Sequence, residues 1–200
     1  MKKIFVDCGT HLFQGFCDFV QRYNIDDTWE CHSFEANPNT FRMSEEKYLS
    51  LLMNQKLNIS HYNKAISNKE GKIKVNCSKD SLGYVSQGSN TLTNPPKYDK
   101  QWKNSFEYSN QEFYVDAIDF SKFLKEISTP SDFVLVKMDI EGSEFDVIES
   151  LIETEAYKLI DEFYCEFHER FFEPQKDYEE KKEYFKKFFL ENNIQIKEWF

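Results

Sequence analysis

The sequence predicts an α/β protein with a mostly parallel, doubly wound sheet and helices on both faces. Two observations lead to this fold class. Short apolar segments with the composition of buried strands alternate with longer segments whose apolar residues recur at helical spacing. No linker or internal repeat divides the 200 residues, so we expect residues 1–200 to form a single domain. Alternating strands and helices in one domain are typical of a parallel sheet that is covered on both faces.

The amino-terminal part supplies two strand–helix units. Lys3–Cys8 is predicted to be a buried strand and Gly15–Tyr23 an amphipathic helix. Trp29–Phe34 is a second strand, and Pro38 then starts a helix that extends over about residues 39–57.

The next segment predicts a β-hairpin. Ile59–Ile66 is its first strand, residues 68–71 carry a turn signal, and Lys72–Asn76 is the returning strand. Ser78–Asn110 shows no periodicity. A long irregular loop in a compact domain is often a lid or a binding loop, and a disordered insertion is the alternative. Its candidate contact residues are Tyr84, Gly88, Ser89, Asn90, Thr91, Tyr98 and Trp102.

The carboxyl-terminal half repeats the strand–helix pattern. Phe113–Ile118 is a strand, and Asp119 caps a helix that ends near residue 127. Phe133–Met138 is the most apolar strand of the chain, and Ser143 caps the helix that follows it.

The last elements close the predicted fold. Ile160–Phe167 is a strand, Asp177–Asn193 is an amphipathic helix, and Ile194–Phe200 is a final strand. The inner face of the helix is predicted to contain Tyr178, Tyr184, Phe185, Phe188 and Phe189.

Composition excludes some classes of function. The formal net charge of −10 argues against a protein that binds duplex nucleic acid. No apolar stretch is long enough to span a membrane, and the amino terminus lacks the features of a signal peptide. Five cysteines without metal-binding spacing are expected to be reduced thiols. We therefore expect a soluble, cytoplasmic protein, and the composition leaves its oligomeric state open.

Polar residues follow four of the predicted strands. They are Asp7, Gly9, Thr10 and His11 after the first strand, Glu35 and Asn37 after the second, Asp139 and Glu141 after Phe133–Met138, and Glu166 and His168 after the next. Doubly wound sheets bind ligands at this edge, and an acidic residue such as Glu35 is well placed for ribose hydroxyls. The G-x-G-x-x-G pattern is absent, which favours an adenosine cofactor without phosphates. A solvated turn at a helix start is the alternative for Asp139 and Glu141.

Five motifs together resemble the FkbM-like S-adenosylmethionine-dependent methyltransferases. They are VDCGTHLFQG (Val6–Gly15), FEANPNTF (Phe34–Phe41), NKAIS (Asn63–Ser67), VKMDIEGSE (Val136–Glu144) and FYCEFHE (Phe163–Glu169). The resemblance implies a Rossmann-like class I methyltransferase fold, mostly parallel with an antiparallel strand near its end. It also implies O-methyl transfer from S-adenosylmethionine to a hydroxyl of a sugar, glycan or related metabolite, with S-adenosylhomocysteine as the product.

The resemblance also implies roles for single residues. The first cofactor turn would contain Asp7, Gly9, Thr10, His11 and Gln14. Glu35 would bind the ribose, Asn37 would shape the turn beside it, and Asn63, Ala65 and Ile66 would border the adenine. Asp139 would face the methionine end of the cofactor or the reaction centre. In one departure, Phe13 stands where many relatives have glycine.

Methylation of a hydroxyl requires removal of its proton, which predicts a general base. His168 is the first candidate because imidazole titrates near neutral pH, and Asp139, Glu141 and Glu166 are its competitors. His168 could instead be structural. A divalent cation on Asp139, Glu166 and His168 is conceivable, but their spacing is not a metal motif, so no metal is favoured.

Three alternatives belong to other classes of function. A binding module that keeps the fold and has lost catalysis would be consistent with Phe13 at the glycine position. Methylation of a nucleic acid or a protein is disfavoured by the acidic balance and by the lack of an Asn-Pro-Pro-Tyr-type motif after Phe133–Met138. An oxidoreductase comes last because the phosphate-binding glycines are missing.

Overall fold

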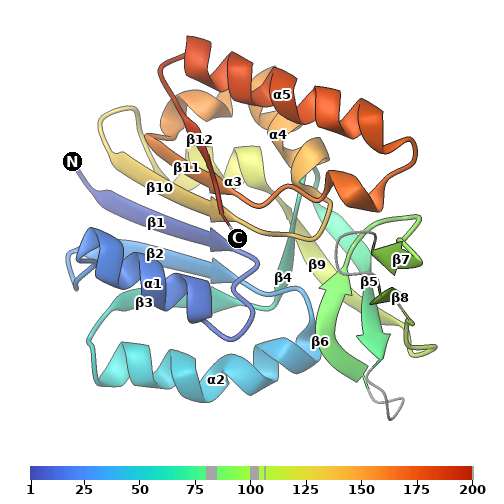
Figure 1. Ribbon diagram of the computed structural model, residues 1–200. Coiled ribbons are helices and arrows are strands. Elements are labelled where there is room, and N and C mark those ends of the chain that lie inside the picture. Colours follow the sequence, from blue (N-terminus) through green and yellow to red (C-terminus); the bar gives the residue numbers. More distant parts are fainter. Residues whose placement is uncertain (80–84, 100–103, 106, 200) are drawn as a thin grey trace.

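The computed structural model describes residues 1–79, 85–99, 104–105 and 107–199. These residues form a six-stranded, a four-stranded and a two-stranded sheet, and the two larger sheets meet beside the carboxyl ends of the central strands (Figure 1). The larger sheet has the order β12-β11-β10-β1-β2-β3. Its strands are β1 (Lys3–Cys8), β2 (Trp29–Phe34), β3 (Asn58–Tyr62), β10 (Phe133–Met138), β11 (Glu162–Cys165) and β12 (Ile196–Glu198).

All neighbouring strands of this larger sheet are parallel. The expected antiparallel strand near the end of the sheet is therefore wrong, because β12 pairs parallel with β11, for example at Phe163 and Ile196. The chain returns through the long helix before β12, and such a crossover lets the last strand run in the same direction as the others. The strand order reverses between β1 and β10, which is the point where doubly wound sheets bind ligands.

Helices cover both faces of the larger sheet (Figure 1). One face carries α1 (Gln14–Tyr23) and α2 (Pro38–Met53), and the other carries α3 (Phe120–Ile127), α4 (Glu144–Glu153) and α5 (Gln175–Glu191), with short 3₁₀ turns η1 (Ala156–Leu159) and η2 (Glu169–Phe171). The side chains of β1 alternate between the two layers: Ile4 and Val6 pack in the core with α3, α4 and α5, whereas Phe5 packs in the core with α1. This confirms the predicted α/β fold with a mostly parallel sheet.

The second sheet has the order β4-β9-β5-β6 and replaces the predicted hairpin. Its strands are β4 (Lys64–Ser67), β5 (Gly71–Lys79), β6 (Val85–Asn90) and β9 (Phe113–Asp119). The single strand expected over Ile59–Ile66 is wrong, since Asn63 separates β3 in one sheet from β4 in the other. The hairpin is also wrong, because β9 lies between β4 and β5 and pairs with both. Ala65, Val75, Val115 and Ala117 form a small core that holds this arrangement.

The segment 78–110 contains regular structure, contrary to prediction. Besides β6 it includes β7 (Tyr98–Asp99) and β8 (Asn104–Ser105), which pair with each other. The β5–β6 pair is supported by side-chain amides rather than by an apolar stripe, because Asn76 Nδ2 donates to Asn90 Oδ1 at 3.1 Å and to the Leu92 carbonyl at 2.9 Å. Hydropathy periodicity gives no signal for such polar pairing.

Most of the predicted helix caps and buried helix faces agree with the structure. The side chain of Asp119 caps α3 by accepting from the Lys122 amide at 3.1 Å, as predicted. Ser143 does occupy the N-cap position of α4, but its hydroxyl forms no capping bond and contacts Thr91 instead. Tyr184 is 55% exposed, so its predicted place on the inner face of α5 is wrong, whereas Phe185 and Phe189 are buried. No helix in the described ranges is both long and apolar enough to cross a membrane.

Candidate functional site

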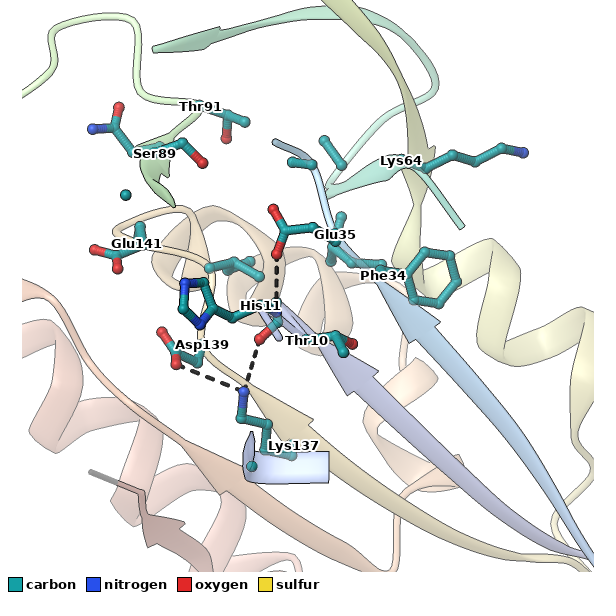
Figure 2. Close-up of a pocket in the computed structure, with 18 of the residues that line it drawn as sticks. Thr10, His11, Phe34, Glu35, Lys64, Ser89, Thr91, Lys137, Asp139 and Glu141 are labelled. Carbon is teal, nitrogen blue, oxygen red and sulfur yellow. Dashed lines mark hydrogen bonds and ion pairs between the residues drawn. The ribbon is translucent and has the colours of Figure 1, made fainter. Parts of the chain in front are cut away.

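A pocket of about 390 Å³ opens at the carboxyl ends of β1, β2 and β10 (Figure 2). This volume lies within the range of small-molecule sites, roughly 300–1,000 Å³. The lining residues come from both sheets and from the carboxyl-terminal segment: Gly9, Thr10, His11, Gln14, Gly15, Phe34, Glu35, Ala36, Lys64, Ala65, Ile66, Gly88, Ser89, Asn90, Thr91, Lys137, Asp139, Ile140, Glu141 and Trp199.

The turn between β1 and α1 follows a tight backbone path. The amides of Gly9 and Thr10 both donate to the Phe34 carbonyl, at 3.0 and 2.9 Å. Gly9 has φ +84°, and a Cβ atom at this position would lie 1.8 Å from the carbonyl oxygen of Asp139. Only glycine therefore fits where this turn meets the end of β10. Phe13 adopts φ +68°, the left-handed conformation that a glycine would take readily.

Glu35 holds this turn to the start of α2. Its Oε2 accepts a hydrogen bond from the His11 amide at 2.9 Å, and its Oε1 accepts one from the Asn37 amide at 2.7 Å. Burial raises the pKa of Glu35 to about 7, although the two backbone donors act to lower it. A carboxylate has about four lone-pair positions, so two remain for hydroxyl groups in the pocket.

Lys137 is a buried cation in the pocket wall, and the sequence analysis did not assign it a role. Its side chain is 3% exposed, and Nζ donates to the Gly9 carbonyl at 2.9 Å (Figure 2). Nζ also lies 3.2 Å from Asp7 Oδ1 and 3.6 Å from Asp139 Oδ2. Burial acts to lower the pKa of Lys137, but the two carboxylates outweigh it and raise the pKa, so the ammonium group stays charged. One charged residue inside an otherwise apolar strand was the signal that could have identified it.

The predicted cofactor residues fall into two groups. Those that line the pocket are Gly9, Thr10, His11, Gln14, Glu35, Ala65, Ile66 and Asp139. Three others lie behind the wall. Asp7 is fully buried against Lys137, Asn37 caps α2 by accepting from the Asn39 amide at 3.0 Å, and Asn63 donates to the Glu35 carbonyl at 2.8 Å.

Four carboxylates surround His168. Its Nδ1 lies 3.0 Å from Glu144 Oε1, and its Nε2 faces three further carboxylates, with Glu141 Oε2 at 3.3 Å, Glu166 Oε1 at 3.5 Å and Asp139 Oδ1 at 4.0 Å. Burial acts to lower the pKa of His168, but the carboxylates, first among them Glu144, raise it to about 10. The imidazole is 1% exposed and is not among the residues that line the pocket, and neither is Glu166. Asp139 and Glu141 connect this cluster to the pocket.

The last residues of β6 and the residue that follows it close the pocket opposite the sheet edge. Gly88, Ser89, Asn90 and Thr91 line it, and Thr91 Oγ1 lies 2.8 Å from Ser143 Oγ in the β10–α4 turn. Of the three rings that the sequence analysis placed in this segment, Tyr98 is exposed and does not line the pocket. Tyr84 and Trp102 lie outside the described residues.

Comparisons with known proteins identify the family of this chain. The family model described as "Methyltransferase FkbM domain" matches residues 7–189. Among solved structures, the chain is similar to the methyltransferase FkbM from Methylobacillus flagellatus KT, at 12% sequence identity and a TM-score of 0.44. That similarity covers 76% of this chain and 30% of the other, so the chain spans under a third of that protein. No curated protein matches the chain significantly.

Proposed function

The chain belongs to the FkbM methyltransferase family, and from this membership we propose that it transfers a methyl group from S-adenosylmethionine to a hydroxyl of a sugar, glycan or related metabolite. One observation carries the proposal. A single pocket at the switch point between β1 and β10 collects Gly9, Glu35 and Asp139 from the ends of three strands. An adenosine cofactor without phosphates needs such a site, because close backbone approach and a ribose-binding carboxylate replace a phosphate cradle.

We place the cofactor by the chemistry of the lining residues. The two lone-pair positions that Glu35 has left would accept the ribose hydroxyls. Ala65 and Ile66 provide an apolar wall for the adenine, and Asn63 supports it by fixing the Glu35 backbone. Lys137 lies beside the first turn, where its ammonium group would attract the carboxylate of the methionine part.

The reaction is an in-line displacement at the methyl carbon. A bond forms between the hydroxyl oxygen and this carbon while the carbon–sulfur bond breaks, and the bonding electron pair stays on sulfur to give S-adenosylhomocysteine. Enclosure of both reactants by the sheet edge and by Gly88–Thr91 would hold them in near-attack geometry.

The proton of the hydroxyl would be taken up by a carboxylate of the acidic cluster beside the pocket. Asp139 and Glu141 reach the pocket directly, whereas His168 and Glu166 lie behind them. We propose that Asp139 faces the reaction centre. His168 acts as a positioning residue that fixes the carboxylates rather than contacting the acceptor.

The alternative of a non-catalytic binding module depended on Phe13. Its backbone takes the left-handed conformation that glycine would take, so the presence of Phe13 does not by itself argue for this alternative. The net charge of −10 continues to favour a small-molecule acceptor over a nucleic acid.

Calorimetric titration with S-adenosylmethionine and S-adenosylhomocysteine tests the cofactor site. We expect binding by the wild type, loss of binding in Glu35→Ala, and unchanged binding in Glu46→Ala, which removes an exposed glutamate from α2. Transfer of a labelled methyl group to a panel of mono- and oligosaccharides then tests the acceptor class. Absence of binding to both ligands by the folded wild-type protein would contradict the proposal.

A further inference from the structure

We infer that Asp139, Glu141 and His168 form a binding site for one divalent transition-metal cation of the Mn²⁺ type. The site adjoins the pocket because Asp139 and Glu141 also line the pocket. The existence of this site does not depend on the proposed function. Only the role of the ion in methyl transfer rests on that proposal.

The three side chains converge from separate segments of the chain. Asp139 follows β10, Glu141 lies in the turn before α4, and His168 follows β11. One ligand atom from each lies within 4.8 Å of the others, and His168 Nε2 is 3.3 Å from Glu141 and 4.0 Å from Asp139. Ligand atoms bound about 2.1 Å from an ion lie at most about 4.2 Å apart, so small side-chain rotations suffice to bring all three to one ion.

The orientation of His168 is an independent indication of a ligand. Glu144 is fully buried and holds Nδ1 at 3.0 Å, while the amides of Ile140 and Gly142 each donate to Glu144 at 2.9 Å. With Nδ1 donating to this fixed carboxylate, loss of the Nε2 proton on metal binding would leave the lone pair of Nε2 directed at Asp139 and Glu141. Nε2 faces Glu141 Oε2 at 3.3 Å and Asp139 Oδ1 at 4.0 Å, and the imidazole is 1% exposed. Carboxylate, histidine and metal ion commonly occur in this order, because the carboxylate fixes the tautomer of the ligand.

The charge balance of the residues around His168 and Lys137 also indicates a bound cation. Among the described residues, five carboxylates face only two permanent cations and one imidazole: Asp7, Asp139, Glu141, Glu144 and Glu166 with Lys137, Arg170 and His168. When all five carboxylates are ionised, even a protonated imidazole leaves two negative charges in excess. Buried charges are normally paired or bound to metal, so one divalent ion would restore the balance.

The ligand set indicates the type of ion. Two carboxylates and one imidazole leave room for water and an acceptor oxygen in an octahedral shell, which suits Mn²⁺ better than Mg²⁺ or Ca²⁺, because the latter two prefer shells made of oxygen alone. Glu166 is not needed as a ligand because Arg170 lies 3.6 Å from it. An acceptor hydroxyl bound to the ion would release its proton more easily.

Titration of the metal-free full chain with MnCl₂, followed by electron paramagnetic resonance of the free ion, tests the site. We expect one bound Mn²⁺ per chain and at least tenfold weaker binding in both Asp139→Asn and Glu141→Gln. Glu141 is 43% exposed, so its variant should fold normally. Asp116→Asn is the matched control, since this exposed aspartate pairs with Lys72 on β5 and should leave binding unchanged.

A spin-echo measurement of the Mn²⁺ complex tests the histidine directly. We expect modulation from an imidazole nitrogen in the wild type and its loss in His168→Gln. No binding by the wild type at millimolar Mn²⁺ overturns the inference. Binding by Asp139→Asn and Glu141→Gln that is as tight as binding by the wild type also overturns it. Titration of the same samples with S-adenosylhomocysteine separates the two proposals: cofactor binding without Mn²⁺ binding removes the metal site alone, and Mn²⁺ binding without cofactor binding removes the proposed function alone.

Discussion

The ionisation of Glu35 is linked to the stability of the fold. The pKa of its buried carboxyl is raised from 4.5 to about 7, so the folded state binds a proton that the unfolded state has already lost between these two pH values. The free energy of unfolding therefore falls as the pH rises through this window. The shift corresponds to about 3 kcal/mol at most.

We predict that the free energy of unfolding of the wild type, relative to that of Glu35→Gln, decreases between pH 5 and pH 8. Urea unfolding of both proteins across this range measures the difference. A difference that stays constant with pH would show that Glu35 titrates normally.

Gly9 is the residue with the least freedom to change. Gly9→Ala would bring Cβ to 1.8 Å from the Asp139 carbonyl, and we expect it to lose the cofactor site and to be at least about 2 kcal/mol less stable than Gly71→Ala. Gly71 is the matched control because it also has positive φ but no atom within 4 Å of its Cβ position, so its substitution tests backbone strain alone. Unfolding free energies and S-adenosylhomocysteine affinity check both variants. Equal losses in the two would show that the close approach to Asp139 has no cost.

At the scale of elements, the contact between the segment after β6 and the β10–α4 turn closes the pocket. Thr91→Val removes the hydrogen bond to Ser143, worth about 1 kcal/mol, and should open this segment about fivefold more often. Amide hydrogen exchange of residues 88–92 measures the opening. Thr93→Val, at an exposed position two residues away, should leave the exchange unchanged. Equal exchange in the wild type and Thr91→Val would mean that other contacts hold the segment.

The elements that the sequence predicted well are those whose partners the topology fixes. β1, β2 and β10 are buried on both faces, so their apolar runs mark them with the observed boundaries. Their carboxyl ends necessarily meet, and for that reason Gly9, Glu35 and Asp139 could be placed together from sequence. β9 could not be placed between β4 and β5, because that order depends on pairing between residues about fifty positions apart and on a core of only a few side chains.

Within the site, too, the residues that distant pairing brings together could not be predicted from local sequence patterns. Trp199 reaches the pocket only because β12 joins the edge of the sheet and returns the chain to the α1 face, where its ring packs on Phe19. No local pattern carries that information. Glu144 is the first residue of α4 and was predicted to be a helix-start carboxylate, yet its hydrogen bonds are made with the preceding turn and with His168.

At the scale of the whole molecule, both sheets contribute to one pocket, so a bound cofactor should stabilise the entire fold. At a concentration one hundred times its dissociation constant, S-adenosylhomocysteine would add about 2.7 kcal/mol. For a chain of 200 residues this corresponds to a rise in the unfolding temperature of roughly 5–11 °C. Thermal unfolding with and without the ligand checks the prediction. Glu35→Ala at the same concentration should show no rise, and a rise of equal size there would mean that the ligand binds elsewhere.

The pairing of β1 with β10 has a consequence for biosynthesis. Gly9 and Lys137 touch in the pocket wall but lie 128 residues apart in the chain. At translation rates of roughly 5–20 residues per second, β1 waits roughly 6–26 s for its partner to be synthesised. During that interval one edge of β1 is unpaired and exposes a template for aggregation. The nascent chain should therefore require protection by a ribosome-associated chaperone until β10 emerges, and the cofactor can take no part in folding before that moment.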